Sequence, residues 1–207
     1  MLVEVRDSCR ITHTVLTRGT GLGYGLAERF LARPNHIVIG AVRNPSTAIA
    51  LKQLPAGEGS SLIIVKIDSF SETDPKTAIE EIKSRGITAV DIVVANAGIC
   101  QVFPQVHEVD FSNLLEHLQV NVFGVIQLFK AVRPLLLASR QPKFVTISTS
   151  AGSLSEMELR NFPNSAYGTS KATLNYITLK THFENPTLTA FPLDPGYVRF
   201  EIWGFSR

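Results

Sequence analysis

The sequence of 207 residues has few of the features that mark extracellular, nucleic-acid-binding or membrane-embedded proteins. Its two cysteines, Cys9 and Cys100, are too few for a disulfide framework, and neither belongs to a CxxC pair. Lys and Arg number 20 and Asp and Glu 18, a formal net charge of +2, and no run of like charges occurs. We therefore expect neither DNA nor an anionic membrane surface as a partner.

Long apolar runs and metal-ligand patterns are also lacking. No run approaches the ~20 apolar residues of a membrane span, and charged residues interrupt the N-terminal segment where a signal peptide would need an apolar core. Both glycosylation-like triplets, at Asn44 and Asn185, carry a disqualifying proline. The five histidines show no metal-ligand spacing, so no metal is expected. These absences predict a soluble cytoplasmic protein with residues 1–207 in one globular domain.

Short apolar runs rich in β-branched residues alternate with amphipathic segments. The runs span residues 11–17, 36–42, 61–67, 90–95, 143–149 and 188–193, and the helical patterns span residues 25–31, 46–54, 74–85, 111–139 and 166–183. Near-continuous apolar runs are typical of strands covered on both faces. The alternation predicts an α/β fold, a doubly wound parallel sheet of the Rossmann type with six strands. A ligand of such a fold binds at the carboxyl ends of the strands.

Closely spaced glycines follow the first predicted strand, in the run Gly19-Thr-Gly21-Leu22-Gly23-Tyr-Gly25. Glycines let backbone N–H groups approach a pyrophosphate, and the following helix adds a favourable dipole. The strict GxGxxG fingerprint fails at Tyr24, and two registers of a looser GxxxGxG spacing compete. One starts at Gly19, and the other has Thr17 in place of its first glycine and continues with Gly21 and Gly23. A plain strand–helix turn is the alternative.

Tyr167 and Lys171 are four residues apart in a predicted helix, which puts the phenol and the ammonium on one face. A phenol has an ordinary pKa of about 10, and a nearby ammonium would lower that pKa and allow proton donation to a carbonyl oxygen. Upstream, the fifth run ends in Ser148, Thr149 and Ser150, whose hydroxyls could bond the carbonyl and the developing alkoxide. The alternatives are a solvated lysine and ordinary turn chemistry.

Taken together, these motifs resemble the short-chain dehydrogenase/reductase family, of the single-domain Rossmann type, over about residues 11–199. The motifs occur in the family's order: the glycine loop, Asp68, Ala95-Asn96-Ala97-Gly98, Asn121, the hydroxyl cluster, Tyr167 with Lys171, and Asp194-Pro195-Gly196. Within the family the chain is most similar to fungal norsolorinic-acid ketoreductase-like reductases, in segments such as residues 30–35 (FLARPN) and 174–186.

The resemblance implies a role for each catalytic candidate. Tyr167 is the general acid in reduction, and Lys171 lowers its pKa and bonds the nicotinamide ribose. Asn121 holds a proton-relay water. The substrate-orienting hydroxyl falls at Thr149, with Ser148 or its neighbour Ser150 as a substitute. Asn121 as a buried amide in a helix kink is the plain structural alternative.

The resemblance also implies a set of cofactor contacts. The glycine loop approaches the phosphates, Asp68 bonds the adenine, the segment after the fourth strand borders the adenosine ribose, and the segment after the sixth contacts the nicotinamide. These residues are Gly19, Gly21, Leu22, Gly23, Asp68, Asn96, Ala97, Gly98, Pro195, Gly196 and Val198, together with Tyr167 and Lys171. A turn cap at Asp68 and a type II turn at Pro195 are the alternatives.

Charge at the end of the second predicted strand bears on the choice of cofactor. That strand ends in Gly40-Ala-Val-Arg43-Asn-Pro45, without the carboxylate that an NAD site normally offers to the ribose 2′-OH. The guanidinium of Arg43 matches a 2′-phosphate dianion and does not deprotonate. We therefore predict NADP(H); the alternative is Arg43 as a solvated turn residue.

The chain departs from the family's pattern in two places. Thr17-Arg18 replaces the usual Thr-Gly pair, and Thr20 replaces a basic residue, so the side chain of Thr17 would crowd the cofactor. After Arg199 only eight residues follow, where the family continues with a substrate-covering segment, a helix and a seventh strand. We therefore expect a C-terminally truncated member whose sixth strand is an edge.

These observations lead to one main hypothesis and two alternatives. The main hypothesis is an NADP(H)-dependent oxidoreductase that moves a hydride between nicotinamide and a carbonyl or secondary alcohol of a small, polyketide- or quinone-like molecule. The first alternative is a catalytically impaired pseudoenzyme that binds nucleotide weakly. The second is an interaction module that uses the exposed sixth strand. A homo-oligomer is compatible with each.

Overall fold

The computed structural model describes residues 11–16, 21–160 and 162–196. The strands are β1 (Ile11–Leu16), β2 (His36–Val42), β3 (Ser61–Lys66), β4 (Ile92–Ala95), β5 (Lys143–Ile147) and β6 (Thr189–Leu193). The α-helices are α1 (Gly21–Leu31), α2 (Ile49–Lys52), α3 (Asp74–Ser84), α4 (Phe111–Leu118), α5 (Gly124–Leu137) and α6 (Ser165–Glu184). All six predicted strands are present, each within two residues of its predicted bounds.

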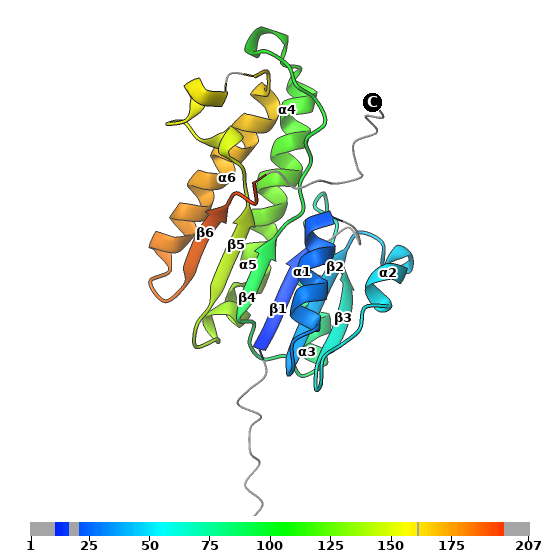
Figure 1. The fold of residues 1–207 in the computed structure, drawn as a ribbon. Helices are drawn as coiled ribbons and strands as arrows, with labels where there is room; N and C mark the ends of the chain where they lie inside the picture. Colours follow the sequence, from blue (N-terminus) through cyan, green and yellow to red (C-terminus); the bar gives the residue numbers. More distant parts are fainter. Residues whose placement is uncertain (1–10, 17–20, 161, 197–207) are drawn as a thin grey trace, which may run out of the picture.

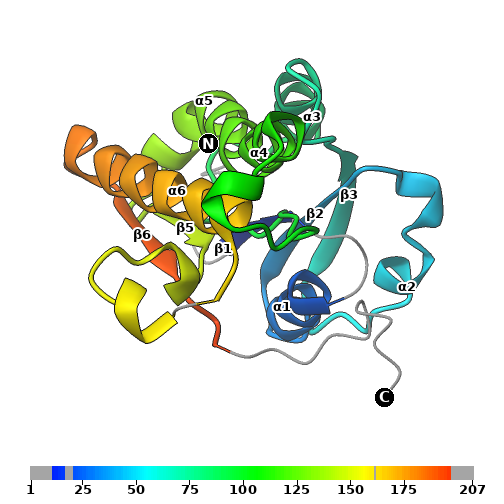
Figure 2. The same cartoon turned by 90° about the horizontal axis from the view of Figure 1, so that it is seen from above.

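The strands form one parallel sheet in the order β3-β2-β1-β4-β5-β6. Because β1 pairs with both β2 and β4, the order of the strands reverses between β1 and β4. Helices α1 and α2 cover one face of the sheet, and α3 to α6 cover the other (Figure 2). This is the predicted doubly wound Rossmann-like fold. It brings the carboxyl ends of all six strands to one edge, at the top of Figure 1.

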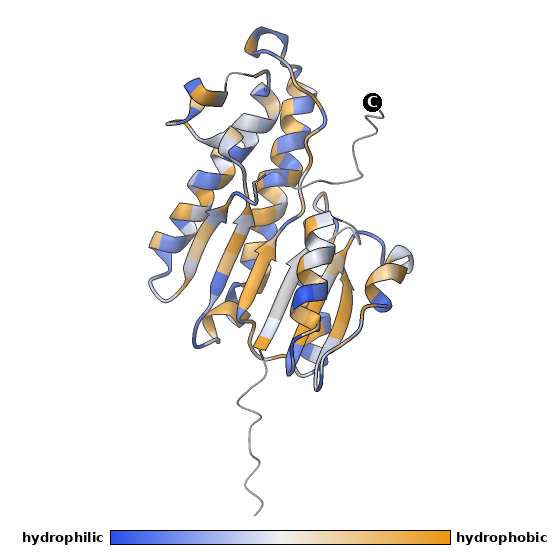
Figure 3. Ribbon diagram, in the orientation of Figure 1, coloured by the Kyte–Doolittle hydropathy of each residue, from blue (hydrophilic) through white to orange (hydrophobic). Residues whose placement is uncertain are grey.

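Burial on both faces of the sheet explains the near-continuous apolar runs. In β2, Val38 and Val42 pack with Leu31 of α1 and Leu51 of α2. Ile39, from the same strand, belongs to the larger cluster beneath α3, α5 and α6. A strand buried in two clusters has no solvent-facing side on which polar residues could alternate. Figure 3 shows the result, since β2, β3 and β4 are mostly hydrophobic whereas the helices carry both kinds of residue.

Helices α4 and α5 form one run, Phe111–Leu137, joined by a π-helical turn at Gln119–Phe123. By length and composition this run could cross a membrane. The expectation that no segment approaches the length of apolar chain that a membrane span needs is therefore wrong. In the fold, half of its most apolar window is buried. Val125, Leu128 and Val132 enter the larger core cluster. These are the features of a helix in the core of a globular domain.

Two predicted helices and strand β4 are among the elements that differ from the structure at their ends. Helix α1 begins at Gly21, earlier than predicted, where the backbone adopts φ of 73°. The segment predicted as one helix over residues 46–54 is a 3₁₀ turn followed by α2, because the Asn44 side chain accepts from the N–H of Ser46 and closes a separate turn. Strand β4 starts late because the N–H of Val90 donates to the carbonyl of Leu135 in α5.

Candidate active site

The start of α6 presents Tyr167 and Lys171 on one face at the carboxyl edge of the sheet. The Lys171 Nζ lies 5.7 Å from the centre of the Tyr167 ring. It donates a hydrogen bond of 2.7 Å to the carbonyl of Ile147 at the end of β5. Lys171 is buried, with 5% of its surface exposed. The predicted shared face is therefore present, and the lysine is held inside the fold rather than solvated.

Asn121 lies in the π-helical turn and is fully buried. Its Oδ1 accepts from the N–H of Ile99 at 2.8 Å, and its Nδ2 donates to the carbonyl of Ile99 at 3.0 Å and to the hydroxyl of Ser170 at 2.9 Å. The side chain thus joins the segment after β4 to α6. Its assignment to a proton-relay water stays a prediction.

Gly98 brings the segment after β4 against both of these side chains. A Cβ atom placed on Gly98 would lie 3.1 Å from Oδ1 of Asn121 and 3.5 Å from Nζ of Lys171. The first distance is tighter than ordinary van der Waals contact, so the position suits glycine. Gly98 also lines a pocket at the carboxyl ends of β2 to β4. The pocket and the Tyr167–Lys171 pair are therefore neighbours.

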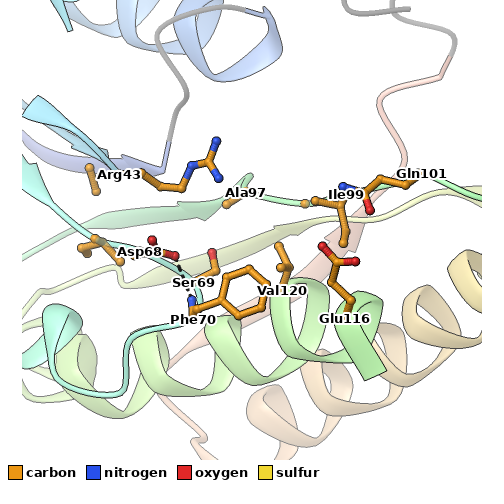
Figure 4. Close-up of a pocket in the computed structure, with 12 residues that line it drawn as sticks. Arg43, Asp68, Ser69, Phe70, Ala97, Ile99, Gln101, Glu116 and Val120 are labelled. Atoms are coloured by element: carbon orange, nitrogen blue, oxygen red, sulfur yellow. Dashed lines mark hydrogen bonds between the residues drawn. The ribbon is translucent and has the colours of Figure 1, made fainter. Parts of the chain in front are cut away.

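This pocket is an open hollow with about 580 Å³ of empty space, a volume that includes open solvent. Residues from the strand ends, from the loops that follow them, from α4 and from the π-helical turn line it: Ala41, Arg43, Ile67, Asp68, Ser69, Phe70, Ala97, Gly98, Ile99, Gln101, Glu116 and Val120. Figure 4 shows Arg43 on one wall, Asp68 and Phe70 on another, and Glu116 reaching in from α4. Four predicted cofactor contacts, Arg43, Asp68, Ala97 and Gly98, thus meet at one pocket.

The two charged residues predicted for this pocket are held differently. Asp68 Oδ1 accepts from the N–H of Phe70 at 3.0 Å, the turn-cap arrangement. The N–H of Asp68 donates to Oδ2 of Asp74 at 3.1 Å, and Asp74 pairs with Lys66 at 3.2 Å. The guanidinium of Arg43 forms no ion pair or hydrogen bond with any described residue and is exposed. It is therefore available to an anion.

The start of α1 bears on the two glycine registers. Gly21 has a φ of 73°, which favours glycine, and Gly23 is buried. A side chain at Gly25 would meet nothing within 4 Å. The geometry favours the register that uses Gly21 and Gly23, with Leu22 half-buried between them. Thr17 to Thr20, including Gly19, lie outside the described residues.

The structure separates the candidate hydroxyls. Ser148 is 6% exposed, and its hydroxyl donates to Oδ1 of Asn175 in α6 at 2.5 Å. The Oγ1 of Thr149 accepts from the N–H of Ala151 at 3.2 Å, which leaves its own hydrogen for another acceptor. The geometry therefore favours Thr149 over Ser148 as the substrate-orienting hydroxyl. The hydroxyl of Ser150 forms no hydrogen bond with a described residue.

After β6, the Asp194 carboxylate accepts hydrogen bonds from two backbone N–H groups. Asp194 Oδ2 accepts from the N–H of Ser150 at 2.7 Å, and its Oδ1 accepts from the N–H of Gly196 at 2.8 Å. Gly196 has a φ of 70°. The turn thus places Pro195 beside the hydroxyl cluster at the end of β5, while Val198 lies outside the described residues.

Burial moves the pKa values of Tyr167 and Lys171 in opposite directions. Burial raises the pKa of Tyr167 above its ordinary 10.0, and Cys100 and Asp194 act in the same direction. Burial lowers the pKa of Lys171 from 10.5 to about 8. The expectation that the pKa of the phenol would be lowered is therefore wrong for the protein alone, because the loss of hydration, the largest cause, raises it. At pH 7 the phenol keeps its proton and Lys171 is mostly charged.

Other ionisable groups near the site are uncharged or dispersed. Burial raises the pKa of the Cys100 thiol to about 11, although Lys171 acts against it, so the thiol is neutral at pH 7. In the parts of the chain that the structure describes, no group of three or more His, Cys, Asp or Glu side chains could hold a metal ion.

Sequence reasoning missed several pocket residues. Ser69 and Phe70 directly follow Asp68, and Val120 directly precedes Asn121, so adjacency to a predicted site residue was the available signal. Gln101 and Glu116, together with the buried His117, depend on the path of the loop after β4 and on the phase of α4. No sequence signal identifies these.

Comparisons with known proteins give consistent results. The model of the family described as short chain dehydrogenase matches residues 13–203. Norsolorinic acid ketoreductase nor1 of Dothistroma septosporum is 43% identical over 201 residues, which cover 95% of this chain and 75% of that protein. Norsolorinic acid ketoreductase stcE of Emericella nidulans is 39% identical over 203 residues, covering 96% and 77%.

Solved structures share the fold. The KRED1-Pglu enzyme superposes with a TM-score of 0.80 at 26% identity, covering 93% of this chain and 76% of that one. The NADPH-bound carbonyl reductase from chicken fatty liver has a TM-score of 0.79 at 23% identity, covering 90% and 76%. At that identity the second likeness concerns the fold alone.

Proposed function

The chain belongs to the short-chain dehydrogenase/reductase family of oxidoreductases, and on that premise we propose that it is an NADP(H)-dependent ketoreductase. It would interconvert a carbonyl and a secondary alcohol on a small organic molecule. The observation that carries the proposal is the position of Gly98. This one residue lines the strand-end pocket and also abuts Asn121 and Lys171, so a dinucleotide in the pocket would reach the proton donor.

The residues around the pocket fit a nicotinamide dinucleotide phosphate. Gly98 leaves space where a side chain would crowd Lys171, and Gly21 and Gly23 open an 11-residue helix whose N-terminus favours phosphate. Arg43 offers an exposed cation without a partner among the described residues, suited to a 2′-phosphate. Asp68 would accept from the adenine amino group. When bound, NADPH would supply the hydride.

Tyr167 would supply the proton that the reduction needs. The raised pKa keeps the phenol protonated at neutral pH, so the phenol is ready to protonate the carbonyl oxygen as negative charge develops there. The proton leaves a phenolate, which the ammonium of Lys171 stabilises until solvent returns a proton. The hydroxyl of Thr149 would donate to the same oxygen and orient the carbonyl.

An apolar substrate is supported by the loops that flank Tyr167. The N–H of Ser165 at the start of α6 donates to the carbonyl of Pro104 at 3.2 Å, which joins the loop after β4 to the segment that follows β5. Both loops carry large apolar side chains that are exposed: Phe103, Val106, Leu154, Met157, Leu159 and Phe162. Such exposed apolar groups favour an apolar ligand. We propose a polyketide- or quinone-like molecule; the ketoreductase relatives are named for norsolorinic acid.

Cofactor titration tests the first part of the proposal. We expect the wild-type chain to quench and shift NADPH fluorescence with a lower Kd than for NADH. Arg43→Glu should weaken NADPH at least tenfold and NADH by about twofold or less, because only NADPH carries the 2′-phosphate. Arg140→Glu, an exposed arginine in the turn that leads into β5, is the matched control and should change neither. Equal losses for both cofactors at Arg43 would refute the preference for NADP(H).

Turnover tests the second part. With menadione as the hydride acceptor, Tyr167→Phe should abolish NADPH oxidation and leave the NADPH Kd within about twofold. Tyr176→Phe, which removes the hydroxyl of a 65% exposed tyrosine on the same helix, should leave the rate unchanged. Substantial activity in Tyr167→Phe would remove its role as the acid. Binding without turnover in the wild type would favour the pseudoenzyme alternative.

A further inference from the structure

We infer that His117 is a positioning residue that holds Tyr167 and the loop after β4 in fixed relation to each other. Its side chain is fully buried, and both ring nitrogens are hydrogen-bonded within the protein. The Nδ1 lies 2.7 Å from the carbonyl of Asn113, and the Nε2 lies 3.3 Å from the backbone nitrogen of Gln101. A carbonyl only accepts, so Nδ1 carries the hydrogen. This fixes the tautomer in which Nε2 accepts from the N–H of Gln101.

The same imidazole also contacts the proposed acid. The rings of His117 and Tyr167 lie 6.4 Å apart between centres at an angle of 69°, an edge-to-face arrangement. Aromatic pairs prefer this geometry because the positive edge of one ring meets the negative face of the other. The contact restricts the orientation of the phenol, whose hydroxyl must meet the carbonyl oxygen within a few tenths of an ångström.

His117 repeats a link that Asn121 makes one turn further along the helical run. The two residues are four positions apart, and they bond backbone groups two positions apart in the loop, Gln101 and Ile99. Both also reach α6, His117 through the ring of Tyr167 and Asn121 through a hydroxyl one turn later. These parallel links fix the loop to α6 at two points.

The position of Gln101 connects this link to the pocket. Gln101 and Ile99 line the pocket that we propose for the cofactor. A substitution of His117 would therefore alter the pocket wall, through the hydrogen bond to Gln101. It would also alter the orientation of Tyr167, through the ring contact. The inference rests on the proposed role of Tyr167 for its catalytic consequence, whereas its loop component concerns the protein alone.

Two substitutions separate the two contacts. His117→Phe keeps an aromatic ring against Tyr167 but removes the acceptor, which leaves the N–H of Gln101 without a partner. His117→Gln keeps an acceptor near the position of Nε2 but removes the ring. His182→Gln is the matched control, because His182 also bonds backbone groups but lies at the opposite end of α6.

Amide hydrogen exchange measures the loop without cofactor or substrate. We expect the Gln101 amide to exchange about tenfold or more faster in His117→Phe than in the wild type, and within about threefold of the wild type in His117→Gln. The control should exchange like the wild type. Unchanged protection of Gln101 in His117→Phe would overturn the loop component of the inference.

Kinetics measures the effect on the site. His117→Gln should lower kcat for menadione reduction about threefold to tenfold with an unchanged NADPH Kd, because the lost contact orients only the acid. His117→Phe should instead raise the NADPH Kd about tenfold. A merely structural histidine would lower the unfolding temperature of both variants without this split. If His117→Phe does not fold, the kcat and Kd of His117→Gln still decide the catalytic component.

The outcomes distinguish this inference from the proposed function. If Tyr167→Phe retains activity, the proposed acid is wrong, whatever the histidine variants do. If Tyr167→Phe is inactive while both His117 variants match the wild type in kcat and Kd, His117 has no positioning role and the proposed function stands.

Discussion

Lys171 allows a sharp test of the electrostatics of the site through stability. The ammonium is buried, with 5% of its surface exposed, and its described partner is a neutral carbonyl, that of Ile147, rather than a carboxylate. Burial lowers its pKa from 10.5 to about 8. This difference corresponds to about 3 kcal/mol of unfavourable free energy when the charged lysine is buried. Lys171→Met, which keeps the length of the chain and removes the charge, should abolish that cost.

The direction of the pH dependence follows from the two pKa values. Below pH 8 the lysine is charged in both the folded and the unfolded chain, and the full cost applies. Between pH 8 and 10.5 the folded chain releases its proton while the unfolded chain keeps it, so the free energy of unfolding rises with pH. Between pH 8 and pH 9 the rise is about 1 kcal/mol. The raised pKa values of Cys100 and Tyr167 act in the opposite direction, chiefly above pH 9 and pH 10 respectively.

Urea unfolding at pH 7, 8 and 9 measures this effect. The wild type should gain stability relative to Lys171→Met by about 1 kcal/mol from pH 8 to pH 9, since the other titrating groups are common to both chains. Lys180→Met is the matched control. Lys180 lies on the same helix, is exposed, and pairs with Glu184 at 2.9 Å, an interaction that raises its pKa. Parallel profiles for the wild type and Lys171→Met would refute the lowered pKa.

Four further substitutions test the packing and the hydroxyls of the site. Gly152→Ala should lower stability by about 3 kcal/mol in urea unfolding, because its Cβ would lie 2.7 Å from the backbone carbon of Lys171. An unchanged midpoint would mean that α6 can shift at no cost. Gly98→Ala should raise the NADPH Kd about tenfold in a fluorescence titration, since the new methyl group fills the pocket wall; an unaltered Kd would separate Gly98 from the cofactor. Thr149→Ala should lower kcat for menadione about 100-fold, whereas Ser148→Ala should keep kcat within about threefold and cost about 1 kcal/mol of stability. The reverse order would reassign the orienting hydroxyl.

The sequence predicts the strands well because each is buried on two faces. Residues 36–42 read as one apolar run, and β2 occupies the same seven positions. The short segment 46–54 is harder, because the capping bond of Asn44 closes a 3₁₀ turn within a pattern that otherwise favours one helix. Composition alone does not distinguish the apolar run of α4 and α5 from a membrane span. The burial of this run in the helical layer beside the sheet is a property of the fold.

Site prediction from the sequence succeeds where one local spacing places the groups together. Tyr167 and Lys171 share a helix face through their four-residue spacing, and the structure keeps them together. His117 cannot be found this way. Besides Asn113 on its own helix, its partners are Gln101, 16 residues away, and Tyr167, which lies on another helix. The π-helical turn at Gln119–Phe123 also alters the helical phase between His117 and Asn121, so an ideal α-helix would misplace one of them.

The opposite pKa shifts of the phenol and the ammonium define when the site can work. With the pKa of Lys171 at about 8 and that of Tyr167 raised, the state with a neutral phenol beside an ammonium dominates at neutral pH. In the proposed reduction, the charge that develops on the carbonyl oxygen would draw the proton from Tyr167, and the nearby ammonium would stabilise the phenolate strongly because little water separates them.

This reasoning predicts the pH dependence of reduction. Above about pH 8 Lys171 loses its charge, so kcat/KM for menadione should fall about tenfold for each further pH unit. Lys171→Arg keeps a cation that does not deprotonate, so any activity it retains should not fall over the same range. A wild-type profile that stays flat to pH 9.5 would mean that the ammonium is not required for proton transfer. The catalytic role would then rest on the phenol and the hydroxyl of Thr149 alone.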